Sequence, residues 1–275
     1  MPGSLIFDSV TVLPLEARGR AAIAASHGGD YAAYLSAKAG LKAVILCDAG
    51  VGRERAGIGG LAYLDRLGVA AAAIGHRSAR IGDGADCHKR GVISFANTCA
   101  NNVGVTAGMA ADEALARLEQ AELPASPTPP AMHEARHEIV EASAPGVCVS
   151  ALDSNALVTP DDVGHIIVTG SHGALLGGRP ATAVKYNVFA AIYNDANFGI
   201  DDVGISRLPA LESRAIAGAT VSAWSARIGD GKSTYRDGYV TAVNTRAAQC
   251  GGEIGISAID LVGRLVAARL KECKS

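Results

Sequence analysis

The sequence has few aromatic residues, few charged residues and almost no net charge. Aromatic residues make up 4% of the 275 positions, charged residues make up 19%, and the net charge is −2 at pH 7. A chain without a basic field does not attract nucleic acid or an anionic membrane. No apolar run approaches the ~18 residues of a membrane span, and the chain does not open with a basic segment followed by an apolar one. We therefore expect a cytoplasmic protein whose partners include neither nucleic acid nor a membrane.

The six cysteines form no recognisable motif. None stands in a CxxC pair, and a disulfide framework or a metal knuckle would require regular spacing. We expect reduced thiols. What the chain does have is small and β-branched residues, with 33 glycines and 49% hydrophobic residues. This composition favours closely packed α/β layers.

One stretch of seven residues occurs twice, as 78–84 and as 225–231, with the sequence Ser-Ala-Arg-Ile-Gly-Asp-Gly. We call the two copies the heptapeptides. The same offset of 147 positions aligns Asp48 with Asp195 and Asn97 with Asn244, and an offset of 145 aligns Ser26-His27-Gly28 with Ser171-His172-Gly173. Such self-similarity predicts a tandem duplication. We expect two Rossmann-like α/β halves with mainly parallel sheets, related by a pseudo-two-fold axis.

The expected elements support this architecture. Strands are expected over 4–13, 21–26, 43–47, 69–75 and 92–96 in the first half, and over 165–169, 188–193, 219–223 and 239–243 in the second. Helices are expected between them, over 30–39, 57–67 and 108–119 in the first half. Continuous apolar strands that alternate with helices indicate a parallel sheet buried on both faces. We place a first repeat at 1–121, a linker at 122–145 and a second repeat at 146–275. The linker has a proline-rich part, 123–130, and an expected short helix, 132–143.

The polar residues that both copies share lie at the ends of predicted strands, where parallel sheets bind their ligands. Histidine suits proton transfer near neutral pH, and aspartate or lysine suits acid–base work. The candidate catalytic residues are His27, His172, Asp83, Asp230 and Lys232. The candidate ligand-binding residues are Ser26, Gly28, Asp48, Ser78, Arg80, Asn97, Ser171, Gly173, Asp195, Ser225, Arg227 and Asn244.

Two of these features suit the binding of an anion. The Ser-His-Gly turns offer backbone N–H groups for an anion, and Arg80 and Arg227 offer planar forks for a carboxylate. The alternatives are glycine turns needed only for tight strand exits, and an Arg–Asp pair that only ties each heptapeptide. We expect no cofactor. A divalent metal held by these histidines with Asp48, Asp195, Asp83 and Asp230 is an alternative, although this set lacks close HxH or HExxH spacing.

The segment 226–233 (ARIGDGKS) fits a relaxed P-loop pattern, but we do not expect it to bind ATP. A P-loop opens directly into a helix, whereas 234–238 is expected to be a turn before a strand. The first copy also has Ala85-Asp86 in place of Lys232-Ser233.

These observations favour an enzyme that uses acid–base chemistry on a small carboxylate-bearing metabolite, in a cleft between the repeats. Hydrolysis of a C–N bond is the first hypothesis, because paired His and Asp groups beside Arg suit water activation and oxyanion stabilisation. A racemase or isomerase with one proton-transfer group from each half is the second. A non-catalytic ligand-binding or assembly protein is the third. We also expect a homo-oligomer.

Overall fold

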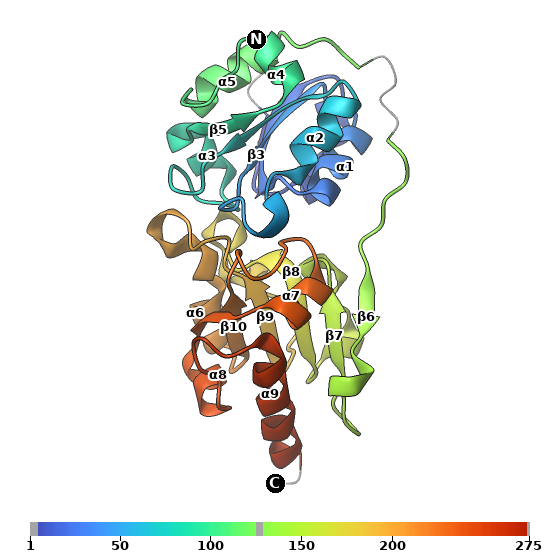
Figure 1. Cartoon of the computed structure of the whole chain (residues 1–275), viewed down its shortest axis with the longest axis vertical. Coiled ribbons are helices and arrows are strands. Elements are labelled where there is room, and N and C mark those ends of the chain that lie inside the picture. Colours follow the sequence, from blue (N-terminus) through green and yellow to red (C-terminus); the bar gives the residue numbers. More distant parts are fainter. Residues whose placement is uncertain (1–4, 125–128, 274–275) are drawn as a thin grey trace.

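The computed structural model describes residues 5–124 and 129–273. The fold is α/β, with two mainly parallel sheets of five and six strands. Figure 1 shows the two sheets in separate halves, which are stacked along the long axis of the molecule.

The first sheet has the strand order β1-β2-β3-β4-β5. β5 is antiparallel to β4, and the other pairs are parallel. The strands are β1 (Leu5–Phe7), β2 (Ala21–His27), β3 (Ala43–Cys47), β4 (Ala70–Ile74) and β5 (Ile93–Ala96). Almost every residue of β2, β3 and β4 is buried, as expected for strands that are covered on both faces.

The second sheet has the order β11-β10-β9-β8-β7-β6. Its outermost strands, β6 and β11, are antiparallel to their neighbours. The strands are β6 (Arg136–Glu138), β7 (Val149–Leu152), β8 (Ile166–His172), β9 (Ala190–Asn194), β10 (Ala217–Val221) and β11 (Val240–Val243).

Helices follow the strands of both sheets. They are α1 (Asp30–Lys38), α2 (Gly59–Arg66), α3 (Gly84–Arg90), α4 (Thr98–Asn102), α5 (Ala111–Leu118), α6 (Arg207–Glu212), α7 (Gly231–Asp237), α8 (Thr245–Gln249) and α9 (Ala258–Glu272). The halves differ after their second parallel strand. β2 leads into helix α1, whereas β8 leads into two 3-10 turns, Leu176–Gly178 and Pro180–Thr182. Among residues 5–124 and 129–273, no helix is long and apolar enough to cross a membrane.

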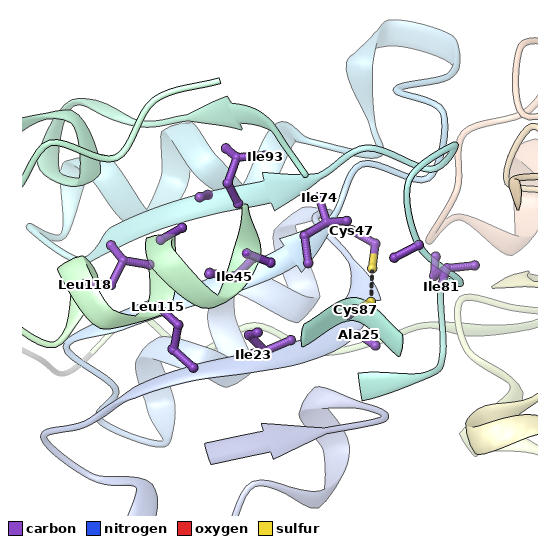
Figure 2. Close-up of a cluster of buried hydrophobic side chains, with 14 of the residues drawn as sticks. Ile23, Ala25, Ile45, Cys47, Ile74, Ile81, Cys87, Ile93, Leu115 and Leu118 are labelled. Carbon is purple, nitrogen blue, oxygen red and sulfur yellow. Dashed lines mark hydrogen bonds between the residues drawn. The ribbon is translucent and has the colours of Figure 1, made fainter. Parts of the chain in front are cut away.

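Small aliphatic side chains fill the space between sheets and helices. Figure 2 shows one such cluster of the first half, in which Ile45 lies near Leu115 and Leu118, and Ile74 lies near Cys47. The same cluster continues into the second half through Ala174, Ala196, Val203 and Ile228. The hydrophobic core therefore crosses the boundary between the halves. Apolar area removed from water there stabilises their contact by ~25 cal/mol per Å².

All six cysteines are free thiols. The sulfur atoms of Cys47 and Cys87 lie 3.5 Å apart inside this cluster (Figure 2). The hydrogen bond between them, followed by burial, raises the pKa of Cys47. The Cys47 thiol is thus an apolar core group at neutral pH.

Three expectations about elements were wrong or only partly right. The segment 132–143 is not a helix: it contains β6 and a 3-10 turn, Val140–Ala142. The segment 4–13 forms only the three-residue β1 before a 3-10 turn, Val10–Val12. Residues 234–237 of the expected turn belong to α7. Within the proline-rich linker, 125–128 lies outside the described residues.

Candidate functional site

His27 and His172 occupy equivalent places as the last residues of β2 and β8. The strand register shifts just before each of them, between Ile23 and His27 and between Val168 and His172. Such irregularities bend a strand and redirect a side chain. Both imidazoles line one cavity of about 350 Å³, which we call the two-histidine cavity.

A second cavity, of about 580 Å³, adjoins the first. We call it the Lys232 cavity, after the candidate lysine in its wall. The two cavities have walls in common, formed by His27, Tyr31, Glu134, Asp153 and Gly229. Residues from both halves line each cavity, so the site lies between the halves at the carboxyl ends of their strands.

Each heptapeptide packs against the histidine of the other half. A Cβ atom at Gly229 would lie 3.3 Å from Cε1 of His27, and one at Gly82 would lie 3.5 Å from Cε1 of His172. Both glycines have φ of +83°, which other residues rarely adopt. Gly82 and Gly229 therefore allow the backbone of one half to approach the histidine ring of the other half.

Both rings are neutral at physiological pH. Burial lowers the pKa of His27 to about 4. Burial, followed by the positive charge of Arg207, holds the pKa of His172 well below its usual value. The Nδ1 atoms accept hydrogen bonds from the N–H groups of Gly29, at 3.2 Å, and Ala174, at 3.3 Å. The single proton of each neutral ring is consequently on Nε2, so Nε2–H is a hydrogen-bond donor.

Glu134 is a functional candidate that the sequence reasoning missed. It precedes β6 and lines both cavities. Burial raises its pKa to about 7, and the nearby charge of Asp153 acts in the same direction, while a hydrogen bond with Ser154 opposes the shift. A carboxyl group with this pKa exchanges its proton readily at neutral pH.

The letters around Glu134 form an HExxH sequence, His133-Glu134-Ala135-Arg136-His137, which the sequence reasoning also missed. In zinc enzymes this pattern lies on a helix, which brings both histidines to one face. Here residues 136–138 form a strand, and residues four apart in an extended chain are about 13 Å apart. Within residues 5–124 and 129–273 there is no group of three side chains suited to a metal ion.

Arg207 and Lys185 were missed for a different reason: neither belongs to a repeated motif. Both line the two-histidine cavity. Arg207 is 3% exposed, and its guanidinium lies 4.9 Å from the ring centre of Tyr193. Its Nε donates to the carbonyl of Ala174 and its Nη1 to the carbonyls of Thr182 and Ala183.

The charged residues of the heptapeptides are engaged within the protein. Asp83 and Asp230 cap α3 and α7, where they accept hydrogen bonds from the N–H groups at the third following position. Arg80 forms an ion pair with Asp201, at 2.8 Å, and Arg227 forms one with Glu54. Each arginine thus pairs with a carboxylate of the other half, and not with the aspartate of its own heptapeptide. Asp230, Arg227 and Lys232 line the Lys232 cavity.

Asn97 and Asn244 are buried at the starts of α4 and α8. The Oδ1 of Asn97 accepts two backbone N–H groups and its Nδ2 donates to two carbonyls. Asn244 makes the equivalent four bonds. Because an amide has two donors and two main acceptor sites, these side chains have no capacity left for a ligand.

Several other candidates also serve the fold. Asp48 accepts the backbone N–H groups of Gly50 and His76, and Asp195 accepts those of Asn197 and Ala223. The hydroxyls of Ser78 and Ser225 accept hydrogen bonds from the backbone N–H groups directly before β5 and β11. Gly28 and Gly173 leave no space for a side chain, since a Cβ atom would meet backbone oxygens at 2.8 and 2.2 Å.

Ser26 and Ser171 lie in the wall of the two-histidine cavity. Each hydroxyl accepts one backbone N–H group, from Val10 at 3.1 Å and from Asn155 at 2.8 Å. Both hydroxyls thereby tie a neighbouring loop to the strand that carries the histidine.

The segment 226–233, which resembles a P-loop, does open into a helix. α7 begins at Gly231, directly after the loop, so the expected turn was wrong. The donors of this loop are nevertheless occupied: Gly231 N–H bonds to Asp153, Ser233 N–H to Asp230, and Arg227 N–H to the Ser233 hydroxyl. A phosphate-binding loop requires such groups to face the ligand.

Comparison with protein-family models, with curated proteins and with solved structures finds no match.

Proposed function

We propose that this protein is an enzyme that uses acid–base chemistry on a small, polar, carboxylate-bearing metabolite in the two-histidine cavity. The reaction we infer is hydrolysis of a C–N bond of the amide type. The observation that carries the proposal is that His27, His172 and Glu134 all line one cavity. Neutral imidazole N–H donors in the same cavity as a carboxyl group with a pKa of about 7 suit this chemistry.

The chain's own residues supply the steps as follows. Ionised Glu134 accepts a proton from a water molecule as the water oxygen attacks the carbonyl carbon of the substrate. The Nε2–H group of His27, and that of His172, donate to the oxygen on which negative charge develops. When the C–N bond breaks, Glu134 returns the proton to the departing nitrogen. The products are a carboxylic acid and an amine or ammonia.

The state of the two histidines favours hydrolysis over racemisation. A racemase needs one group that accepts a proton and another that donates one on opposite faces of the substrate. Both rings here are neutral and both have Nδ1 occupied by a backbone N–H group. Two matched donors suit an oxyanion better than a stereocentre.

We also infer that the two halves are duplicated copies related by a pseudo-two-fold axis. Paired contacts support this inference. The N–H group of Arg53 bonds to the carbonyl of Ala223, and the N–H group of Ile200 bonds to the carbonyl of His76, each at 2.8 Å. The cytoplasmic location and the homo-oligomeric state expected from the sequence stay predictions.

The test is a hydrolysis screen. Amides of small mono- and dicarboxylic acids are incubated with the wild-type protein, and release of ammonia or amine is measured between pH 5 and pH 9. We expect turnover that rises as Glu134 ionises near pH 7, and a loss of at least a hundredfold in Glu134→Gln. Glu138→Gln is the matched control, because Glu138 is exposed on the same segment.

Other outcomes would replace the proposal. Exchange of a substrate proton with deuterated solvent, without hydrolysis, would favour an isomerase. Tight binding of a carboxylate without any turnover would favour a binding protein. Full activity in Glu134→Gln would remove Glu134 from the mechanism.

A further inference from the structure

The most unusual charged group of the molecule is Arg207. Its side chain is buried beside the two-histidine cavity, and its hydrogen bonds go to neutral groups, namely three backbone carbonyls and the hydroxyl of Tyr193. Among residues 5–124 and 129–273, no carboxylate lies within ion-pair distance of it. Burying a charge without an opposite charge is costly. Burial indeed lowers the pKa of Arg207.

The first half has no equivalent of this arginine. Gly60 occupies the matching position, where a Cβ atom would lie 2.5 Å from the carbonyl oxygen of Gly29 and 2.6 Å from Cβ of Ala33. Helix α1 thus packs directly on that backbone. In the second half the two 3-10 turns replace the helix, and Arg207 and the cavity occupy the space beside them.

Lys185 adds a second positive charge to the same wall. It is exposed, and its ammonium group lies 5.2 Å from the ring centre of Tyr186. It forms no ion pair with any residue that the structure describes. The carboxylates of this cavity, Glu134 and Asp153, are held by other partners, Ser154 and the N–H groups of Ala135 and Gly231.

We propose that Arg207 and Lys185 form the subsite for the carboxylate group of the substrate, and so replace Arg80 and Arg227 as the anion clamp. This assignment rests on the proposed function. A carboxylate beside Arg207 would supply the missing opposite charge, and water would screen this pair less than a pair at the surface because Arg207 is buried. Arg80 and Arg227 already have carboxylate partners of their own. The substrate class that follows is a small amide with a free carboxylate, which is anchored in the second half with its reactive carbonyl near His27 and Glu134.

A competing role for Arg207 is purely structural, since its hydrogen bonds also hold the irregular segment 174–183. The two roles differ in their response to ligand. A structural role lowers stability with or without a carboxylate. A binding role also removes the gain in stability that a carboxylate gives.

Propionate and propionamide are suitable probes, because they have nearly the same shape and differ in charge. Binding is measured by calorimetry and thermal unfolding at constant ionic strength, for the wild type, Arg207→Lys, Arg207→Gln and Lys185→Gln. Lys89→Gln is the control, because it removes one exposed positive charge outside the cavity. Lys185→Gln keeps the test decisive if Arg207→Gln does not fold.

We expect the wild type to bind propionate at least tenfold more tightly than propionamide, because charged hydrogen bonds are the stronger ones. Arg207→Gln should lose at least tenfold in propionate affinity and Lys185→Gln severalfold, while Lys89→Gln is unchanged. Equal affinities for both probes, no binding of either, or unchanged propionate affinity in Lys185→Gln and Arg207→Lys would overturn the subsite. Propionate binding that persists in Glu134→Gln, with no amide hydrolysed by the wild type, would keep the subsite and refute the proposed reaction.

Discussion

Replacing Glu134 by Gln should stabilise the folded protein at alkaline pH. Burial raises the pKa of Glu134 to about 7 from an ordinary value of 4.5. A shift of this size corresponds to about 3 kcal/mol of unfavourable interaction in the ionised form. Water reaches the cavity and screens part of it, so we expect a net cost of about 1–2 kcal/mol. The amide of Gln has a similar shape and no charge, so it avoids this cost.

The sign of the pH dependence follows from the direction of the shift. Because the folded-state pKa lies above the unfolded value, the contribution of Glu134 to stability is fully present below pH 4.5 and is lost as the pH rises through about 7. The variant lacks this loss. The two proteins should therefore have nearly equal free energies of unfolding at pH 4.5, and the variant should exceed the wild type by about 1–2 kcal/mol at pH 8.

Urea unfolding at pH 4.5, 6, 7 and 8 measures this difference directly. All other groups titrate in both proteins, so their effects cancel when the two curves are subtracted. Glu138→Gln should show no such trend, since Glu138 is exposed. A variant that is less stable than the wild type at pH 8, or a difference independent of pH, would mean that the folded protein does not disfavour ionised Glu134. That result would refute the assignment of a raised pKa and, with it, the case for a proton-transfer group at neutral pH.

Four further predictions concern the rest of the site. The wild type should lose up to about 3 kcal/mol of stability as the pH falls from 6.5 through about 4, since His27 binds a proton more readily in the unfolded chain than in the folded protein. The variant His27→Gln should lack this pH dependence in urea titrations. Arg227→Ala should cost about 1 kcal/mol or less in thermal unfolding and leave propionate affinity unchanged, because the pair with Glu54 is partly exposed. Gly229→Ala should cost about 1–2 kcal/mol and lower the rate of amide hydrolysis, because φ is +83° and the new methyl group crowds His27. Treatment with EDTA, and separately His137→Ala, should leave the hydrolysis rate unchanged, because the HExxH letters are not on a helix; a loss restored by zinc would contradict this.

The strands of the fold were predictable because their sequences carry a local signal. Continuous apolar runs such as 43–47 form strands with the expected bounds. The wrong helix at 132–143 has a non-local cause: β6 forms because Arg136 pairs with Leu152 and Glu138 with Ser150 of β7. The ion pair between Arg136 and buried Asp162, at 2.7 Å, strengthens that contact. The sequence of 132–143 alone contains no signal that predicts these partners.

The missed helix α7 has a similar explanation. Its residues, Gly-Lys-Ser-Thr-Tyr-Arg-Asp, are mostly poor helix formers. The helix forms because Asp230 caps its first turn and Tyr235 is buried in the core of the second half. Tertiary packing thus overrides local preference.

The candidate site contains two kinds of residue, those that occur in both halves and those that occur only once. Asn97 and Asn244, like the capping Asp83 and Asp230, recur because each copy needs their hydrogen bonds to close its strand and helix ends. Their recurrence predicted their importance, although the need that they meet is one of folding. Residues with a task that only one site requires are not expected to recur.

Glu134 and Arg207 are residues of this second kind. Glu134 comes from the segment between the halves, and Arg207 stands where the first half has Gly60. Burial opposes the ionisation of each, a condition that is common at functional sites. The histidines belong to both kinds: Nδ1 of each is used by its own turn, yet Nε2 of His27 has no hydrogen-bond partner among the described residues. Each half therefore places one histidine in the wall of the cavity, and Glu134 and Arg207, which are not part of the repeated sequence, are the residues for which we propose the roles of base and carboxylate anchor.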